Sequence, residues 1–209
     1  MLTINHLQTI KELKPFYAKK VFSNIFSWNE LLSLLNNRPF MTNSRVHILN
    51  NKEEGYEWPA GGWLTDWDTY PASLLQEEIK KYVCYLQDCS RVNENINMIC
   101  EDIEKALSLP VDAHIFFSLK EPETDTSGFK KHNDTQHNVI TLVEGQMNIK
   151  VWSKEDKIII DEDMEPGDIC FVPKETDHQV IPYTKRLSVS FPALTGDDQF
   201  MQDRHWIKI

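Results

Sequence analysis

The sequence is short of glycine, cysteine and long apolar runs, and each shortage narrows the kind of protein it encodes. Its 209 residues include only 7 glycines, and they contain no internal repeat or low-complexity segment. No apolar run approaches the roughly 20 residues that cross a membrane. The first twenty residues are mixed and charged, and they lack the apolar stretch of a secretory signal. We therefore expect a cytoplasmic protein that does not span a membrane.

Cysteine and basic residues are also scarce. The four cysteines, at positions 84, 89, 100 and 170, form no CxxC pair and no repeated spacing. In a chain without an export signal we expect reduced, mostly buried thiols, not disulfides or zinc ligands. The 22 Lys and Arg residues against 32 Asp and Glu give a formal net charge of −10. This charge argues against nucleic acid as the main partner, because backbone binding needs a positive field.

What is present indicates one folded domain. An apolar fraction of 41% and six tryptophans exclude a disordered chain, and the length suffices for a full core. We expect a single domain over 1–209. It comprises a helix-rich N-terminal portion at 1–108, a β-rich core at 109–194 and a tail at 195–209 that packs on the domain or across a homodimer interface.

Helical patterns dominate the first half of the chain. Four amphipathic helices are predicted. One spans 10–19 and is interrupted by Pro15, a second begins after the N-cap residue Ser27, and the other two span 72–87 and 93–107. A strand is predicted at 45–50. Between them, 54–72 is a loop rich in Trp, Tyr, Gly and Pro. This loop either forms a lid or wall for a pocket or pads the core.

After Pro110 the pattern becomes that of strands. Eight short runs rich in Val, Ile and Phe are separated by turn residues, at 113–119, 129–134, 138–145, 146–153, 157–161, 167–173, 178–183 and 186–193. This number and spacing predict a mainly β fold, a double-stranded β-helix or jelly roll, preceded by the helical portion.

Three side chains in the β region are candidate metal ligands. His132 and Asp134 are two residues apart, so on an extended segment they point to the same face. In a jelly roll the seventh strand, which begins at His178, lies near the same mouth of the barrel. Two His and one carboxylate on one side of a metal leave positions open, which is the arrangement of non-haem Fe(II) oxygenases. We therefore predict an iron site at His132, Asp134 and His178.

A 2-oxo acid such as 2-oxoglutarate could fill the open positions, and its distal carboxylate would need a cation. Arg186 is the candidate, because its planar guanidinium pairs bidentately with a carboxylate; a surface salt bridge is the alternative. Ser188 shares its strand face and could add a hydroxyl bond. Asn138 could reach an iron-bound carboxylate or, alternatively, bond the backbone. Lys150 is the second candidate for the cation.

Two further histidines and several aromatic residues are assigned lesser roles. His137 is five residues from His132, so we expect an exposed His or one that supports the site from behind. His114, on an apolar strand, could line the pocket, but we expect a hydrogen-bonded core residue. Apolar walls around the site are expected from Phe116, Phe129, Trp152 and Phe171.

These residues resemble the cupin-like Fe(II)/2-oxoglutarate oxygenases, in particular the JmjC and ribosomal-oxygenase group. The segment GFKKHNDTQHNVITLVEGQMNIKVW at 128–152 is similar to their GF-x-x-H-x-D motif with its following strands, and PGDICFVPKETDH at 166–178 matches a later element. The resemblance implies iron ligands at His132, Asp134 and His178. It also implies 2-oxoglutarate as co-substrate and hydroxylation of a C–H in a peptide or protein side chain, or in a small amino-acid-like metabolite.

The resemblance has one departure. Many JmjC-type enzymes carry the basic 2-oxoglutarate residue at a position that falls on Met147 here, whereas the Arg186-Leu-Ser188 segment looks like the Arg-x-Ser of prolyl-hydroxylase-type oxygenases. Asn138 matches an Asn that contacts the co-substrate in the asparaginyl hydroxylase branch. Two other functions remain open. One is a cupin metalloenzyme that does not use 2-oxoglutarate, a direct-acting dioxygenase or an isomerase, in which Arg186 binds a substrate acid. The other is a non-catalytic jelly-roll binding module.

Overall fold

The computed structural model describes residues 1–37, 45–49, 72–119 and 130–194. The aromatic loop predicted at 54–72 falls outside these ranges except for its last residue, and the tail at 195–209 lies wholly outside them. Helices in the described part are α1 (Ile4–Lys11), α2 (Trp28–Leu35), α3 (Ala72–Glu78) and α4 (Glu94–Leu107). Strands are β1 (Phe16–Ala18), β2 (Val46–Leu49), β3 (Val83–Leu86), β4 (His114–Ser118), β5 (His137–Glu144), β6 (Met147–Trp152), β7 (Ile158–Met164), β8 (Ile169–Val172), β9 (His178–Pro182) and β10 (Arg186–Ala193).

Two of the predicted helices form, one with the expected N-cap Ser27 and the other with Asn93, the first residue of the predicted helix, as its N-cap. The Ser27 hydroxyl accepts a hydrogen bond from the backbone N–H of Glu30 at the start of α2. The Asn93 side chain accepts one from the N–H of Ile96 at 2.8 Å, which caps α4. Each bond satisfies one of the N–H groups that have no partner within the helix.

The other two helix predictions are wrong in part. The helix expected at 10–19 ends at Lys11, and the residues after Pro15 form β1, which pairs with β8. The helix expected at 72–87 ends at Glu78, and Val83–Leu86 form β3 between β2 and β4. The apolar spacing of this segment fits a helix, but pairing on both sides buries Cys84 and Leu86 in the sheet. Tertiary contacts therefore override the local pattern.

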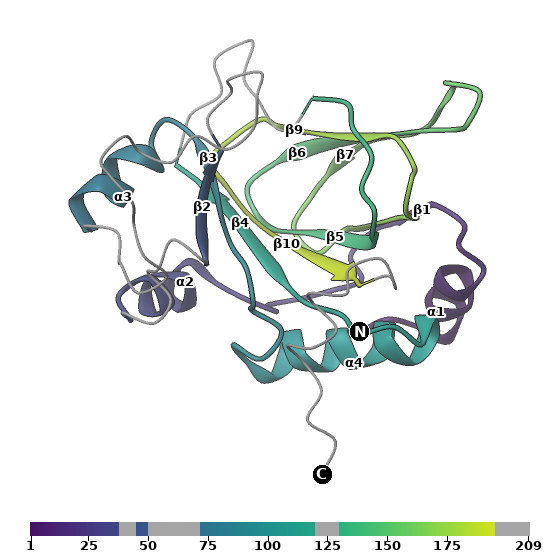
Figure 1. Cartoon of the computed structure of the whole chain (residues 1–209), viewed down its shortest axis with the longest axis horizontal. Helices are drawn as coiled ribbons and strands as arrows, with labels where there is room; N and C mark the ends of the chain where they lie inside the picture. Colours follow the sequence, from purple (N-terminus) through teal and green to yellow (C-terminus); the bar gives the residue numbers. More distant parts are fainter. Residues whose placement is uncertain (38–44, 50–71, 120–129, 195–209) are drawn as a thin grey trace.

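The described strands form two antiparallel sheets (Figure 1). The large sheet has seven strands in the order β1-β8-β5-β10-β4-β3-β2, and the small sheet has three in the order β7-β6-β9. Seven of the eight predicted β runs contain strands. The run at 129–134 contributes only an isolated bridge between His132 and His178. The mainly β, double-sheet jelly-roll fold with an N-terminal helical portion is thus confirmed.

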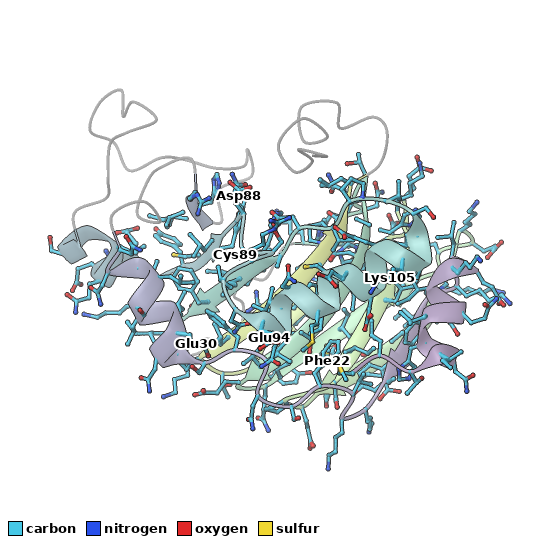
Figure 2. The ribbon with its side chains drawn as sticks, turned by 90° about the horizontal axis from the view of Figure 1, so that it is seen from below. Phe22, Glu30, Asp88, Cys89, Glu94 and Lys105 are labelled. Atoms are coloured by element: carbon cyan, nitrogen blue, oxygen red, sulfur yellow. The ribbon has the colours of Figure 1, made fainter. Side chains whose placement is uncertain are left out.

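Alternation along the strands produces two separate apolar cores. One face of the large sheet packs against the helices, and Figure 2, seen from that side, shows α4 lying across the sheet with α1 and α2 beside it. The other face encloses a smaller core against the small sheet, which includes Ile140, Leu142, Ile149 and Val172. On β10, Leu187 packs in the helix-covered core whereas its neighbour Arg186 faces the space between the sheets. The strands of the large sheet therefore carry core residues on one face and site residues on the other.

The four cysteines are free and buried, as the sequence predicts. Burial raises the pKa of all four thiols. They therefore remain protonated and unreactive in the folded protein at neutral pH. Within the described ranges, no helix combines the length and the apolar character needed to cross a membrane.

Candidate metal centre and adjoining pocket

The three predicted metal ligands come together at one end of the jelly roll. His178 begins β9, and His132 lies beside it on the segment that precedes β5. The backbone N–H of each histidine donates to the carbonyl of the other, at 3.0 Å from His132 and 2.7 Å from His178. The carbonyl of Asp134 accepts from the N–H of Glu175 at 2.7 Å. Main-chain hydrogen bonds therefore hold all three residues, although 46 positions separate the two histidines.

The side chains of these residues offer their ligand atoms to one small space. One ligand atom from each of His132, Asp134 and His178 lies within 4.8 Å of the others. The Nε2 of His132 is 3.6 Å from Asp134 Oδ1, and the Nε2 of His178 is 3.5 Å from Asp134 Oδ2. These separations are longer than good hydrogen bonds. The group is therefore arranged to hold a cation between its members, and two imidazoles with one carboxylate suit a divalent transition metal.

Backbone carbonyls fix the tautomer of both imidazoles. The Nδ1 of His132 is 2.8 Å from the carbonyl of Lys130, and the Nδ1 of His178 is 3.1 Å from the carbonyl of Thr176. A carbonyl only accepts, so each Nδ1 carries the proton and each Nε2 keeps its lone pair for a metal. Burial also lowers the pKa of His178, and neighbouring His132 acts in the same direction while Asp134 opposes it. The neutral form, which binds metal, is favoured.

A cavity of about 360 Å³ adjoins the three ligands. Its walls come from β3, β4, β5, β9 and β10, so it lies between the two sheets. On β10 the lining residues are Arg186, Ser188, Ser190 and Pro192, which alternate with the core residues of the same strand. The volume lies within the usual range of small-molecule pockets. It can accommodate a small organic acid next to a metal.

Arg186 lies in this pocket, and its charge is not neutralised by any acidic group in the described part of the chain. The residue is 3% exposed. Its Nη1 lies 3.5 Å from the sulfur of Met147, and its buried Nε has no hydrogen-bond partner among the described residues. Burial lowers the pKa of Arg186 to about 10, so the guanidinium is still protonated at neutral pH. This burial contradicts the alternative of a surface salt bridge, and a buried unpaired guanidinium is suited to bind an anion.

Met147 lies next to Arg186. It is on β6, at the position where the resemblance leads us to expect a basic residue, and it is buried in the core between the sheets. Its sulfur is 3.5 Å from the Nη1 of Arg186. The guanidinium carried by β10 therefore reaches the side chain at that position of β6.

Lys150, the second candidate for the cation, lies outside the pocket. Its neighbours on β6, Ile149 and Val151, are buried in the core between the sheets, so Lys150 points to the other face. There its Nζ is 3.3 Å from Asp161 Oδ2, in a separate hollow that also contains Tyr183. Lys150 is therefore not placed to bind a ligand next to the three metal-ligand candidates.

Asn138 and two serines complete the polar lining of the pocket. The Nδ2 of Asn138 donates to Asp134 Oδ2 at 3.4 Å, and the hydroxyl of Ser190 donates to Asn138 Oδ1 at 2.6 Å. Asn138 thus bonds side chains and not the backbone. Ser188 lines the same pocket between Arg186 and Ser190. Ser190 was not predicted as a site residue, although its position two residues after Ser188 on one strand face gives the signal.

An aromatic wall from β3 and β4 was only partly predicted. Tyr85, His114 and Phe116 all line the pocket. Tyr85 stacks on His114 with ring centroids 5.7 Å apart and on Phe116 at 5.1 Å. His114, expected in the core, is 3.3 Å from the buried carboxylate of Asp112. Sequence reasoning missed Tyr85 because its segment has a helical apolar spacing.

The remaining predicted residues lie away from the pocket. His137 is buried, accepts a hydrogen bond from the N–H of Lys174 at 3.1 Å and stacks near Phe171, so it is not exposed. Phe171 itself belongs to the helix-covered core and forms no wall of the site. Trp152 lies under the ammonium of Lys131 and is not among the lining residues. Phe129 lies outside the described residues.

Comparison with solved structures identifies the fold. A crystal structure of the ribosomal oxygenase YcfD of Escherichia coli matches with a TM-score of 0.68 and 17% identity, over 97% of this chain and 55% of that one. YcfD in complex with cobalt and 2-oxoglutarate matches with a TM-score of 0.62 and 16% identity, over 91% and 50%. The chain therefore spans about half the length of these relatives. No protein-family model and no curated protein sequence matches it. At this identity the likeness establishes the architecture alone: the chain has a jelly-roll fold similar to that of the ribosomal oxygenase YcfD.

Proposed function

We propose that this protein is a non-haem Fe(II)- and 2-oxoglutarate-dependent oxygenase that hydroxylates a C–H of a peptide or protein side chain. A single observation carries the proposal. Two imidazoles and a carboxylate converge at a pocket that also contains a buried guanidinium without a carboxylate partner in the described part of the chain. A metal and a dicarboxylic acid would satisfy both features at once.

The donor set fits Fe(II). His132, Asp134 and His178 would hold the ion through two nitrogens and one oxygen, and such a face leaves positions for a chelating co-substrate and for O2. Bound Fe(II) supplies the activation of O2 coupled to oxidative decarboxylation of the 2-oxo acid. The carbonyls of Lys130 and Thr176 keep both imidazoles in the tautomer that binds metal. The protein thus contributes a preorganised set of ligands.

Arg186 would bind the distal carboxylate of 2-oxoglutarate. The pocket next to it offers about 360 Å³, enough for a five-carbon dicarboxylate. A guanidinium pairs with a carboxylate through two parallel N–H bonds, which would satisfy its unpaired Nε. The Ser188 hydroxyl would add a third bond to the same carboxylate. Ile140 and Val180 line the pocket and would limit water around this ion pair.

The fold supports a protein substrate. The solved relatives described above are named as ribosomal oxygenases. An amino-acid-like metabolite is the second substrate class, because the pocket walls of Tyr85, His114 and Phe116 suit a small planar or apolar group as well as a side chain. Cytoplasmic location and homodimerisation remain predictions from the sequence.

Succinate formation tests this function without a known substrate. Protein prepared without oxygen receives Fe(II) and 2-oxoglutarate and is then exposed to O2. We expect iron-dependent succinate from the wild type, none from His132→Ala, and a much raised requirement for 2-oxoglutarate in Arg186→Met. Lys150→Met, which removes a cation of the outer face, is the matched control and should behave like the wild type.

Two results would overturn the proposal. Metal-dependent turnover that is indifferent to 2-oxoglutarate would instead identify a direct-acting cupin enzyme. Absence of succinate, together with no perturbation of the metal-centred spectrum by 2-oxoglutarate, would leave a binding module.

A further inference from the structure

Asp134 differs from the two histidines in how its side chain is held. The imidazoles of His132 and His178 each bond a backbone carbonyl, so their orientations are fixed from behind. The carboxylate of Asp134 is 29% exposed, and it lies on a segment whose only described β contact is the bridge at His132. A carboxylate in this situation can rotate about its side-chain bonds unless another group holds it.

A chain of two hydrogen bonds leads from the large sheet to this carboxylate. The hydroxyl of Ser190, on β10, donates to Asn138 Oδ1 at 2.6 Å, and Asn138 Nδ2, on β5, donates to Asp134 Oδ2 at 3.4 Å. Ser190 is 5% exposed and Asn138 is 9% exposed. Both residues belong to paired central strands of the sheet, with Ser190 opposite Ile140 and Asn138 opposite Pro192. The donor to Asp134 is therefore built on a rigid support.

The donor and acceptor roles in these two hydrogen bonds follow from the chemistry of Asp134 and Ser190. A carboxylate only accepts hydrogen bonds, so the NH2 of Asn138 must face Asp134. The opposite amide orientation would place Oδ1 against the carboxylate and leave Ser190 to bond an amide nitrogen. The short bond from the Ser190 hydroxyl to Oδ1 therefore selects the amide orientation that donates to Asp134. The amide thus engages Oδ2, and Oδ1 is 3.6 Å from the Nε2 of His132.

We propose that Ser190 and Asn138 are positioning residues that set the Asp134 carboxylate for metal binding, an inference that rests on the proposed metal centre. Ser190 acts only through Asn138, and it fixes the carboxylate in one orientation before the metal arrives. Removing such a supporting bond typically weakens metal affinity by about 10- to 100-fold. This role differs from the one implied by the family resemblance, in which Asn138 contacts the co-substrate. That role would leave metal affinity in the absence of 2-oxoglutarate unchanged.

Titration of the metal-free protein with Co(II), in the absence of 2-oxoglutarate, distinguishes the two roles. We expect Ser190→Ala and Asn138→Ala to weaken Co(II) binding by about 10- to 100-fold. Ser190→Thr, which keeps the hydroxyl, should restore most of the affinity. The matched control is Thr141→Val, which removes a buried hydroxyl on β5 that donates to the carbonyl of Asp168 at 2.8 Å. It should lower stability without changing Co(II) affinity.

The outcomes separate this inference from the proposed function. If the wild type binds Co(II) and the folded Ser190→Ala variant binds it equally well, the positioning role is wrong while the metal centre stands. If affinity for 2-oxoglutarate falls in both variants and Co(II) affinity does not, Asn138 is a co-substrate contact and the inference is again wrong. If the wild type itself binds no Co(II), the proposed metal centre fails and this inference fails with it. Ser190→Ala removes a single oxygen atom, so the test does not depend on Asn138→Ala folding.

Discussion

Replacing Arg186 by methionine is expected to stabilise the ligand-free protein and to weaken binding of 2-oxoglutarate. The side chain is 3% exposed, and among the described residues its contact is with the sulfur of Met147. Burial lowers its pKa from 12.5 to about 10. A folded-state pKa below the unfolded value means that folding disfavours the charged form, and at neutral pH the full penalty applies. The difference corresponds to at most about 3 kcal/mol, which methionine would relieve.

The same substitution should remove most of the affinity for the co-substrate. Truncating one partner of a buried, hydrogen-bonded charge pair costs about 2 to 5 kcal/mol, which is roughly 30-fold to several thousand-fold in dissociation constant. Thermal unfolding with Co(II), with and without 2-oxoglutarate, measures both effects. In the absence of ligand, each kcal/mol gained raises the melting temperature by about 2 to 4 °C in a chain of this size. Ligand at 100 times the wild-type dissociation constant should stabilise the wild type by about 2.7 kcal/mol and Arg186→Met by less than about 1 kcal/mol.

Lys150→Met is the control for this experiment. Lys150 is 30% exposed and paired with Asp161, so its loss should cost less than about 1 kcal/mol. Its response to 2-oxoglutarate should equal that of the wild type. The reasoning is refuted if Arg186→Met melts several degrees below the wild type and gains as much stability from 2-oxoglutarate as the wild type does. That result would mean that the guanidinium is satisfied without a ligand.

Two further predictions concern stability. Gly167→Ala should lower the free energy of unfolding by at least about 2 kcal/mol in urea titrations. Gly167 has φ +93°, and a Cβ there would lie 2.3 Å from the carbonyl oxygen of Phe22. An unchanged free energy of unfolding would show that the site accommodates a Cβ without strain. Burial alone would raise the pKa of Asp112, but nearby His114 together with the backbone N–H groups of Ala113 and Asp88 outweighs it and holds the pKa below its usual value. The wild type should therefore lose stability as the pH falls from about 5 to about 2, and Asp112→Asn should show a shallower loss. If the urea midpoint of unfolding falls equally steeply with pH in both proteins across this range, Asp112 does not contribute to the loss.

Much of the candidate site could be predicted because its signals are local. His132 and Asp134 share a face through a spacing of two residues, and His178 follows a turn and a short apolar strand. Arg186 and Ser188 follow from alternation along a single strand. Period-two alternation depends only on the extended backbone of one segment, so it can be predicted without knowing which segments pair with that one.

The parts that sequence reasoning missed depend on partners far along the chain. Tyr85 lies on a strand because β2 and β4 pair with β3 on both sides. The residues of 72–87 do not by themselves indicate which segments will pair with them. Alternation places Ser190 on the strand face of Arg186 and Ser188, but its 2.6 Å bond to Asn138 depends on the pairing of β5 with β10 and on two side-chain rotamers. Lys150 lies on the outer face of β6, because its neighbours Ile149 and Val151 fill the core between the sheets.

The two faces of β10 make the core and the pocket depend on the same strand register. Leu187, Val189 and Phe191 fill the helix-covered core, while Arg186 and Ser190 face the pocket. A slip of one residue in the pairing of this strand would exchange the two sets, because side chains alternate with a period of two. The slipped chain would place a guanidinium among apolar helices and open apolar groups to the cavity. A copy with this slip would thus be unstable as well as wrongly built at the pocket, and it would be exposed to chaperones and proteases. Quality control of folding in the cell would remove slipped copies without any means of sensing what the pocket binds.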